Sequence, residues 1–408
     1  MAISSTTVAT ASLVLIPTAV FTYFYTQRQP ISQSSAADMA PKRNVVIVGG
    51  GAAGTIIARE LSAKLERSKY NLILITSRPE FLYLPASIRL VVVDGYPTED
   101  AIMPYDKLFI NGNGSVRVGT VAAVENSKEG NGGRVVLEDG DSVQWDTLIL
   151  ASGSVWEGPL ALPSEREQYH AHVRSWRQKF IDAKHVVLAG GGSVGIEFAG
   201  ELKDVYPNKK VTIVHSDQDL LNGIYPSKWR KNIGKRMRAR GVDLVLNDYV
   251  EGAPESGTII TRNGHMIKDV DLVVPTRGGR PNTSFIKSLT PSPVNQRGFV
   301  QVEPTLQVKS HPGIFAVGDI LDWQEAKQFA KIRGHAPVVV ANVLAYLEGQ
   351  PQKKVYKGSP ELIVVTNGKN GGFAYVGLLW GLTFGDWFAR MLKSKDLMVP
   401  GIRKSLGL

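Results

Sequence analysis

The stretch Asn44-Val-Val-Ile-Val-Gly-Gly-Gly-Ala-Ala-Gly54 decides the fold of this chain. Its β-branched run ends in a glycine turn, and the Ala/Ile/Leu-rich residues that follow predict a helix through about Leu65. A second apolar run at residues 71–76 completes a strand, helix and strand unit. The same pattern recurs at His185-Val-Val-Leu-Ala-Gly-Gly-Gly-Ser-Val-Gly195, followed by an apolar run at residues 210–215. The sequence therefore predicts an α/β fold with two Rossmann-like, three-layer domains.

Both glycine turns have the spacing Gly-x-Gly-x-x-Gly, at Gly49, Gly51 and Gly54 and at Gly190, Gly192 and Gly195. In this motif the first glycine permits a tight turn, the second lets the backbone approach a pyrophosphate, and the third lets helix and strand pack closely. The phosphates lie on the helix N-terminus, which is Ala52-Ala53 in the first turn and Ser193-Val194 in the second. A lone match is weak evidence, but two matches between a strand and a helix predict that the chain binds two dinucleotides.

A carboxylate that binds the ribose 2′-hydroxyl is expected about 20 residues after each turn. The first of the following strands ends in Thr76-Ser77 and the second in His215-Ser216, so neither ends in an acidic residue. Nothing obvious at the second site repels a 2′-phosphate, and NADPH is as acceptable there as NADH.

The chain has 408 residues, which is enough for two or three domains, and it has no cysteine. The absence of cysteine excludes a disulfide framework, a cysteine-ligated zinc or iron–sulfur site, a thiol nucleophile and a dithiol redox relay. We expect no metal site, and any redox chemistry must use a bound organic cofactor. The formal net charge of +10 permits attraction to phosphate, nucleic acid or an anionic membrane, and a solvated basic surface fits it equally well.

Residues 1–42 are predicted to be an apolar anchor and linker. No charged side chain occurs from Met1 to Gln27, and residues 8–25 would span about 27 Å as a helix, close to the thickness of a bilayer core. The basic residues that follow predict catalytic domains facing the cytosol, on the mitochondrial outer membrane, the endoplasmic reticulum or a lipid droplet. A disordered leader is the alternative, and Met39 could start a soluble cytoplasmic form.

The order of the motifs predicts how the domains are arranged. Residues 43–158 and 278–355 are expected to form one domain, because the sequence after Arg277 returns to the character of the first unit. Residues 159–277 are expected to form a second domain inserted into the first. Residues 356–408 are expected to form a small C-terminal element that associates with a membrane or with a second copy of the chain.

Three further segments follow the pattern of one enzyme family: Asp146-Thr-Leu-Ile-Leu-Ala-Ser-Gly-Ser154, Pro275-Thr-Arg-Gly-Gly-Arg-Pro-Asn282 and Gly313-Ile-Phe-Ala-Val-Gly-Asp319. With both glycine turns they resemble the two-dinucleotide-binding-domain pyridine-nucleotide:flavin oxidoreductases. Phe81, Pro85-Ala86 and Arg89 further resemble the apoptosis-inducing-factor-homologous, ferroptosis-suppressor branch, which is close to the type II NADH dehydrogenases. The resemblance implies a flavoprotein that binds FAD and passes electrons from NADH or NADPH to a quinone at a membrane surface.

The resemblance also implies which residues contact each nucleotide. The residues expected at the FAD are Gly49, Gly51, Ala52, Ala53, Gly54, Arg89, Ala151, Ser152, Gly153, Gly318 and Asp319. Those expected at NAD(P)H are Gly190, Gly192, Ser193, Val194, Gly195, His215, Ser216 and Gly278.

Three side chains are candidates for catalysis by the same resemblance. Glu197 would lie near the nicotinamide and flavin, although an acid in the first turn of a helix is also favoured by the helix dipole. Lys327 would stabilise the negative charge of reduced flavin, or else be a solvated lysine. His335 would pass a proton to the reduced quinone, or else be a packed structural histidine.

Two segments near the surface suggest partners. Residues 228–240 carry seven basic residues in thirteen, which suits a solvated helix, anionic lipid, nucleic acid or an NADPH phosphate. At the C-terminus, apolar residues recur at helical spacing, which predicts an amphipathic helix at a lipid interface or in a homodimer: Trp380, Phe384, Trp387, Phe388, Met391 and Leu392.

The leading hypothesis is thus a membrane-associated NAD(P)H:quinone oxidoreductase. The alternative is a nucleotide-sensing flavoprotein in cell-death signalling whose basic surface binds nucleic acid or an electron-carrier protein.

Overall fold

The computed structural model describes residues 41–127, 132–254, 256–378 and 381–408. The chain divides into two units, Met1–Lys42 and Arg43–Leu408, and the fold below is that of the second unit. The predicted N-terminal anchor lies outside the described residues. Within the described ranges no helix is both long and apolar enough to cross a membrane.

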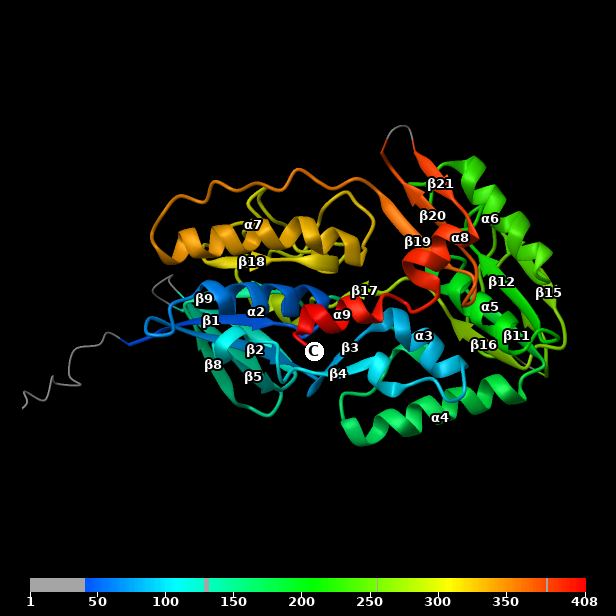
Figure 1. Cartoon of the computed structure of the whole chain (residues 1–408), viewed down its shortest axis with the longest axis horizontal. Coiled ribbons are helices and arrows are strands. Elements are labelled where there is room, and N and C mark those ends of the chain that lie inside the picture. Colours follow the sequence, from blue (N-terminus) through cyan, green and yellow to red (C-terminus); the bar gives the residue numbers. More distant parts are fainter. Residues whose placement is uncertain (1–40, 128–131, 255, 379–380) are drawn as a thin grey trace, which may run out of the picture. The chain divides into compact units, whose positions relative to one another are not determined.

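The first sheet is parallel, with the strand order β18-β9-β1-β2-β5 (Figure 1). Residues Val45, Val46 and Ile47 of the central strand are fully buried, because helices cover the sheet. The strands are β1 (Arg43–Val48), β2 (Tyr70–Thr76), β5 (Ser115–Val118), β9 (Thr147–Leu150) and β18 (Ile314–Ala316).

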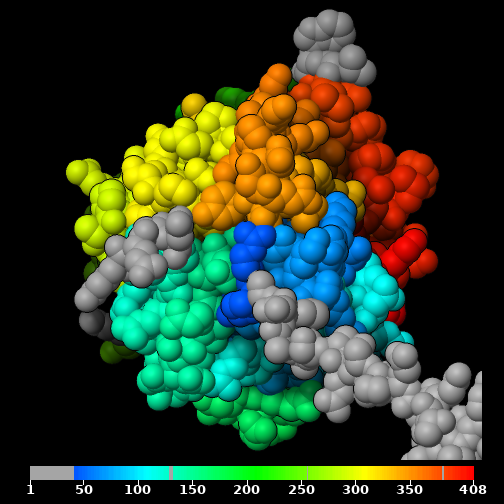
Figure 2. Space-filling model, turned by 90° about the vertical axis from the view of Figure 1, so that its left-hand side faces the viewer, coloured from blue at the N-terminus to red at the C-terminus, as the bar shows by residue number. Residues whose placement is uncertain are grey.

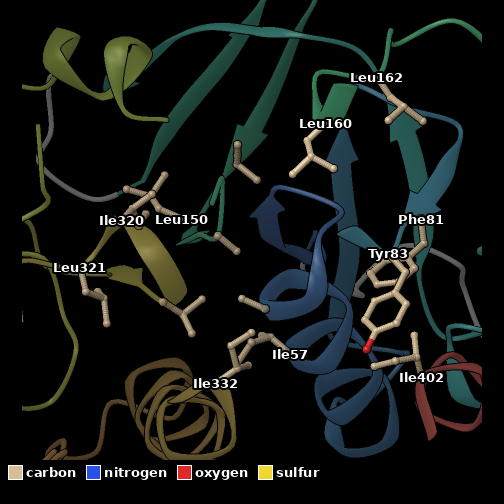
Figure 3. Packing of buried hydrophobic residues seen from close by; sticks show 14 of the residues in the cluster. Ile57, Phe81, Tyr83, Leu150, Leu160, Leu162, Ile320, Leu321, Ile332 and Ile402 are labelled. Carbon is tan, nitrogen blue, oxygen red and sulfur yellow. The ribbon is translucent and has the colours of Figure 1, made fainter. Parts of the chain in front are cut away.

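Helices α2 (Ala52–Lys64) and α7 (Phe329–Leu347) pack against each other beside this sheet. Ile332 of α7 lies close to Ile57 of α2, and both belong to the main hydrophobic cluster (Figure 3). The segment after α7, residues 348–361, runs back along that helix (Figure 1), and the orange surface in Figure 2 includes it. The Asn342 side chain holds this segment through hydrogen bonds to the backbone of Lys354.

The second sheet is also parallel and has the order β13-β12-β11-β16. Its strands are β11 (His185–Ala189), β12 (Lys210–His215), β13 (Val242–Leu246) and β16 (Leu272–Pro275). Its helices are α4 (Arg166–Asp182), α5 (Ser193–Val205) and α6 (Ser227–Ala239). Strands β14 (Ile259–Ile260) and β15 (Met266–Ile267) form a hairpin between β13 and β16.

The two crossings between the sheets lie side by side. Strand β10 (Ser154–Val155), on the way into the second sheet, pairs with β17 (Arg280–Pro281), on the way back. The chain thus leaves the first sheet after β9 and returns to it at β18, as an insertion of one domain into the other requires. The predicted fold class, two Rossmann-like domains with one inserted, is therefore confirmed.

Smaller elements complete the first domain. An antiparallel meander consists of β6 (Val121–Asn126), β7 (Gly133–Leu137) and β8 (Ser142–Trp145). A two-stranded ribbon consists of β3 (Glu80–Leu82) and β4 (Ile102–Pro104), and α3 (Leu84–Val92) lies between these strands in the sequence. Short 3-10 turns occur at Thr98–Asp100, Ile110–Gly112, Gly158–Leu160 and Ser284–Ser288.

The C-terminal element is an antiparallel sheet followed by short helices. Its members are β19 (Leu362–Thr366), β20 (Gly372–Val376), β21 (Leu382–Phe384), α8 (Asp386–Ala389), a π-helical turn (Arg390–Ser394) and α9 (Val399–Leu406). The prediction of a helix that includes Phe384 is wrong, because Leu382–Phe384 pairs with β20. The helix starts only after Gly385, and Trp380 lies outside the described residues.

Candidate functional site

The first glycine turn leaves room for a ligand only on its outer side. Gly49 has φ +116°, and a Cβ there would lie 2.3 Å from the Ala151 carbonyl oxygen. A Cβ on Gly54 would lie 1.8 Å from the Gly49 oxygen, so this position admits only glycine. A Cβ on Gly51 would meet nothing within 4 Å, and α2 begins at the next residue. The free N–H groups of a helix N-terminus and an open approach are what a pyrophosphate needs.

This turn opens into a cavity of about 700 Å³. That volume is within the usual range for a cofactor or ligand site. Most of the residues predicted to contact FAD line it: Gly49, Gly51, Ala52, Ala53, Ala151, Ser152, Gly153, Gly318 and Asp319. The structure thus brings together residues from three distant parts of the sequence.

The aromatic side of the cavity was missed by the sequence analysis. Phe81 and Tyr83 both line the cavity, and their rings stack with centroids 6.4 Å apart (Figure 3). The Tyr83 hydroxyl donates to the Leu397 carbonyl at 2.8 Å and lies near Ile402 of α9, so the C-terminal element closes this wall. Burial, with a contribution from the Glu197 carboxylate, raises the pKa of Tyr83 and keeps this hydroxyl protonated.

Glu80 was also missed. Among the acidic residues that line the cavity, Glu80 follows the end of β2 most closely in sequence. The strand itself ends at Thr76. The Glu80 carboxylate pairs with Arg166. The only signal in the sequence is its position four residues after Thr76, beyond the place where the motif puts a ribose-binding acid.

Asp319 lies in the turn after β18, where Gly318 has φ +82°. The Ser154 hydroxyl donates to Asp319 Oδ2 at 2.8 Å, and this contact fixes the carboxylate at the cavity wall. The Gly318 N–H points at Nδ1 of His335, at 3.4 Å. The turn is thus held from one side by a hydroxyl and from the other by an imidazole.

His335 does not line the cavity; its side chain is 1% exposed. Because Nδ1 faces a backbone N–H, Nε2 carries the proton and donates to Glu325 at 2.8 Å. The Tyr356 hydroxyl donates to the other Glu325 oxygen. Burial alone would raise the pKa of Glu325, but the hydrogen bonds from His335 and Tyr356 outweigh it and lower the pKa. His335 therefore supports the Gly318–Asp319 turn from behind.

Lys327 also lies behind the cavity wall. Its Nζ donates to the carbonyl oxygens of Leu321 at 2.7 Å and Trp323 at 3.2 Å, and it is 5.2 Å from the centre of the Phe299 ring. Burial lowers the pKa of Lys327. In this arrangement the ammonium group stabilises the loop that follows Asp319.

The second glycine turn repeats the geometry of the first. Gly190 has φ +136°, and a Cβ on Gly195 would lie 1.9 Å from the Gly190 oxygen. A Cβ on Gly192 would meet nothing within 4 Å, and α5 begins with Ser193-Val194. This turn therefore has the same open approach to a helix N-terminus. Gly278 lies beyond β16 and is likewise open to substitution.

The His215 side chain supports the second glycine turn through hydrogen bonds. Its Nδ1 accepts a hydrogen bond from the Gly191 N–H at 3.2 Å, and its Nε2 donates to the Leu221 carbonyl at 3.1 Å. Both ring nitrogens are thus used within the protein. Ser216, the next residue, begins the loop after β12.

Glu197 and Arg89 tie the domains together. The Glu197 carboxylate accepts from Lys393 Nζ at 2.6 Å and from the Thr366 N–H at 3.1 Å. Arg89 does not line the cavity; its guanidinium makes a buried pair with Glu201 at 2.6 Å and also donates to the Ser394 carbonyl at 3.0 Å. Arg89 therefore connects α3, α5 and the C-terminal element, and its contact with FAD stays a prediction.

Known proteins match this chain over most of its length. The family model for pyridine nucleotide-disulphide oxidoreductases matches residues 43–342. An FAD-dependent oxidoreductase of Flammulina velutipes is 46% identical over 321 residues, 78% of this chain and 99% of the relative. Apoptosis-inducing factor homolog A of Dictyostelium discoideum is 28% identical, covering 93% of each chain. Human ferroptosis suppressor protein 1 is 27% identical, covering 89% of this chain and 95% of its own.

A solved structure shares the fold. The sulfide:quinone oxidoreductase of Aquifex aeolicus superposes with a TM-score of 0.70 at 18% identity, covering 89% of this chain and 91% of that one. Because the identity is low, this likeness supports the fold alone.

These comparisons confirm the resemblance to the apoptosis-inducing-factor and ferroptosis-suppressor relatives. They also confirm FAD as the cofactor and NADH or NADPH as the co-substrate, and the first turn fits FAD because Gly51 leaves its outer side open. The chain belongs to the pyridine nucleotide-disulphide oxidoreductase family.

Proposed function

We propose that this oxidoreductase transfers electrons from NAD(P)H through FAD to a quinone at a membrane surface. The observation that carries the proposal is the pair of equivalent glycine turns on two sheets whose connecting strands, β10 and β17, pair directly. One turn opens into a cavity whose size suits a resident cofactor, and the other suits a second dinucleotide. The chain has no cysteine, so electrons that reach the flavin have no dithiol to receive them.

When bound, FAD supplies the group that accepts a hydride and returns electrons to an acceptor. The chain's own residues bind and orient it. Asp319, held by Ser154, accepts hydrogen bonds at the cavity wall, while Phe81 and Tyr83 exclude water from the aromatic side. His335 and Lys327 hold the Asp319 turn from behind, so we assign them positioning roles rather than direct contact with the reacting atoms.

Among the three catalytic candidates, Glu197 is the one nearest in sequence to the second glycine turn, two residues after Gly195. Its negative charge is compensated by Lys393 from the C-terminal element. In the proposal this pair fixes the N-terminal part of α5, next to the second glycine turn, against the C-terminal element.

The quinone assignment is tested by steady-state turnover. The purified full-length chain should reduce a short-chain ubiquinone with NADH or NADPH, and the rate should depend on bound FAD. Turnover with a soluble dye and none with the quinone would contradict the acceptor that we propose.

Association with a membrane is supported by a surface of the C-terminal element. Its exposed apolar side chains are Leu378, Leu382, Phe384, Trp387, Met391 and Leu392, and Trp387 is 76% exposed. Helix α6 lies beside it, because Arg236 pairs with Asp386 of α8 and its guanidinium lies 4.5 Å from the centre of the Phe373 ring. An exposed apolar surface next to basic groups is typical of a protein that binds an anionic lipid interface.

The membrane contact is tested by fluorescence quenching in the full-length chain. Brominated lipid in vesicles of anionic composition should quench tryptophan fluorescence, and Trp387→Phe should remove a large part of the quenching. The matched change Trp176→Phe, on α4, should leave it nearly unchanged. Equal quenching in wild type and Trp387→Phe would show that this surface does not meet lipid, and a stable homodimer that covers Trp387 would assign the surface to a second copy.

A second candidate function rests on the exposed basic side chains of α6, which are Lys228, Lys231, Lys235 and Arg238. Such a face suits nucleic acid or an acidic electron-carrier protein. It predicts salt-dependent DNA binding that is lost when these residues are replaced by alanine. Absence of DNA binding at low salt would remove the nucleic-acid form of this candidate.

A further inference from the structure

At the edge of the second sheet, near the second glycine turn, lie two arginines that have no acidic partner among the residues that the structure describes. We propose that Arg262 and Arg277, arranged around Tyr249, bind the 2′-phosphate of NADPH and make the enzyme prefer NADPH to NADH. This inference rests on the proposed role of the second turn as the nicotinamide-dinucleotide site, and it names the form of the dinucleotide that the site takes.

The strand order places these residues at the ligand-binding edge. Tyr249 follows β13 and Arg277 follows β16, the two outer strands of the order β13-β12-β11-β16. Arg277 Nη1 donates to the Tyr249 hydroxyl at 2.8 Å, so this contact bridges the edge where β12 and β11 also end. The Arg277 backbone nitrogen lies 2.9 Å from where a Cβ on Gly190 would be. Dinucleotides bind outside the carboxyl ends of such strands.

Arg262 reaches the same tyrosine from the β14–β15 hairpin. Its guanidinium lies 4.6 Å from the centre of the Tyr249 ring, and that of Arg277 lies 5.2 Å away. The hairpin is held in place by Asp248, which accepts hydrogen bonds from the Thr261 hydroxyl and the Asn263 N–H. The Asp248 N–H in turn donates to the His215 carbonyl at 3.0 Å. The two arginines therefore lie beside the end of β12, where the 2′-position of the adenosine ribose is read.

The charges at this edge favour an anion. Within the described part of the chain neither Arg262 nor Arg277 forms an ion pair, and the buried Nε of Arg277 has no hydrogen-bond partner. The nearest acid after β12, Asp217, is paired with Arg230 at 2.6 Å. The Asp248 carboxylate is already engaged by the hairpin. Two guanidinium groups that lack a counter-ion among these described residues match the charge of a phosphate monoester.

The same edge offers little to the 2′-hydroxyl of NADH. That hydroxyl is normally bound by a carboxylate at the end of the strand after the turn. Here the position is His215, whose two ring nitrogens are bonded to Gly191 and Leu221. The preference for NADPH thus comes both from a group that binds the phosphate and from the missing acceptor for the hydroxyl.

The test uses fragments that bind without electron transfer. Adenosine 2′,5′-bisphosphate carries the 2′-phosphate of NADPH, and 5′-AMP lacks it. In calorimetric titrations of the FAD-loaded full chain, the bisphosphate should bind at least about tenfold more tightly, as expected when charged hydrogen bonds are added. Equal affinities would overturn the proposal, whether or not the enzyme reduces a quinone.

Variants identify the residues. Arg262→Gln and Arg277→Gln should each reduce the advantage of the bisphosphate over 5′-AMP, and the double variant should abolish it. Tyr249→Phe keeps the ring but removes the hydroxyl that holds Arg277, so it should give a smaller loss. Arg43→Gln is the matched control, because Arg43 also lies over a tyrosine, Tyr70, at 5.1 Å, but in the first domain. If the bisphosphate keeps its full advantage in the double variant, or loses it in Arg43→Gln, the assignment is wrong.

Discussion

The first and second glycine turns have the same spacing and nearly the same backbone, but their surroundings differ. In each, the third glycine packs its Cα within touching distance of the first glycine's carbonyl, and the middle glycine is open. The first turn is supported by the Tyr105 hydroxyl, which donates to the Gly50 carbonyl at 2.8 Å. The second is supported by His215 and by the Thr276 hydroxyl, which donates to the Gly190 carbonyl at 2.8 Å.

The larger difference is what covers the two turns. Residues from several distant segments line the cavity of the first turn, and none of them comes from the second turn. The C-terminal element packs behind Tyr83 in the wall of this cavity. A cavity that buries most of a ligand suits a cofactor that stays bound through many turnovers. A co-substrate must leave after every hydride transfer, and the second turn has the same phosphate-binding backbone outside that cavity.

The largest expected effect comes from adding one methyl group to each turn. Gly54→Ala places a Cβ 1.8 Å from a backbone oxygen, so strand and helix must separate, and FAD content should fall at least about tenfold. Gly195→Ala, with its Cβ at 1.9 Å, should keep FAD but block reduction by NAD(P)H. Absorbance of the purified proteins and anaerobic addition of nucleotide measure both.

Gly401→Ala is the control for this pair, because a Cβ there meets nothing within 4 Å. Loss of FAD from Gly195→Ala, or its retention in Gly54→Ala, would show that the roles of the two turns are not divided as we propose.

The link between the domains should be sensitive to the pair of Arg89 and Glu201. Their side chains are 6% and 4% exposed, and they join α3 of the first domain to α5 of the second. Arg89→Met leaves a buried carboxylate without its partner and should cost about 3–5 kcal/mol of unfolding free energy. The double change Arg89→Met with Glu201→Met should cost much less. Urea unfolding measures both, and equal costs would mean that lost packing, not the unpaired charge, is responsible.

Electron transfer between the two sites should depend on Glu197. Glu197→Gln keeps the hydrogen bond from the Thr366 N–H but removes the charge beside Lys393. We expect flavin reduction to slow by roughly tenfold, less than the hundredfold or more that is lost with a group contacting the reacting atoms, with FAD content unchanged. Stopped-flow absorbance measures the rate. An unchanged rate would make Glu197 a structural residue that anchors the C-terminal element.

The smallest expected effect concerns the support behind Asp319. The pKa of Glu325 is lowered in the folded protein, so its ionised form stabilises the fold above its usual value, near 4.5, and this contribution is lost as the pH falls through the lowered pKa. Glu325→Gln should flatten the decrease of the melting temperature as the pH falls below about 4.5, relative to wild type. A parallel decrease in the two proteins would show that the ionisation of Glu325 does not contribute.

The sequence was sufficient to predict the scaffold but not the contacts that hold it. Strand β12 occupies residues Lys210–His215 as expected, and β1 begins one residue before the expected start, because glycine spacing and apolar periodicity are local signals. The nine cavity-lining residues predicted for FAD were found in the same way, through short motifs.

Contacts between distant segments leave no such signal. Glu325 accepts a hydrogen bond from His335, and Arg89 pairs with Glu201 and does not line the cavity. Neither contact could be predicted, because the partner of a charged side chain depends on tertiary packing. The helical pattern that included Phe384 failed for a related reason. Pairing with β20 satisfies the backbone of Leu382–Phe384, and sequence periodicity does not report that neighbour.

We propose that the first turn holds FAD and that the second delivers NAD(P)H to it for a quinone. An anaerobic stopped-flow experiment on the full-length protein, in which nucleotide is mixed first and a short-chain ubiquinone second, tests this proposal. We expect NADPH to bleach the flavin absorbance, the quinone to restore it, and Gly195→Ala to abolish the bleaching while the flavin stays bound. A flavin that neither NADPH nor NADH can bleach would contradict it.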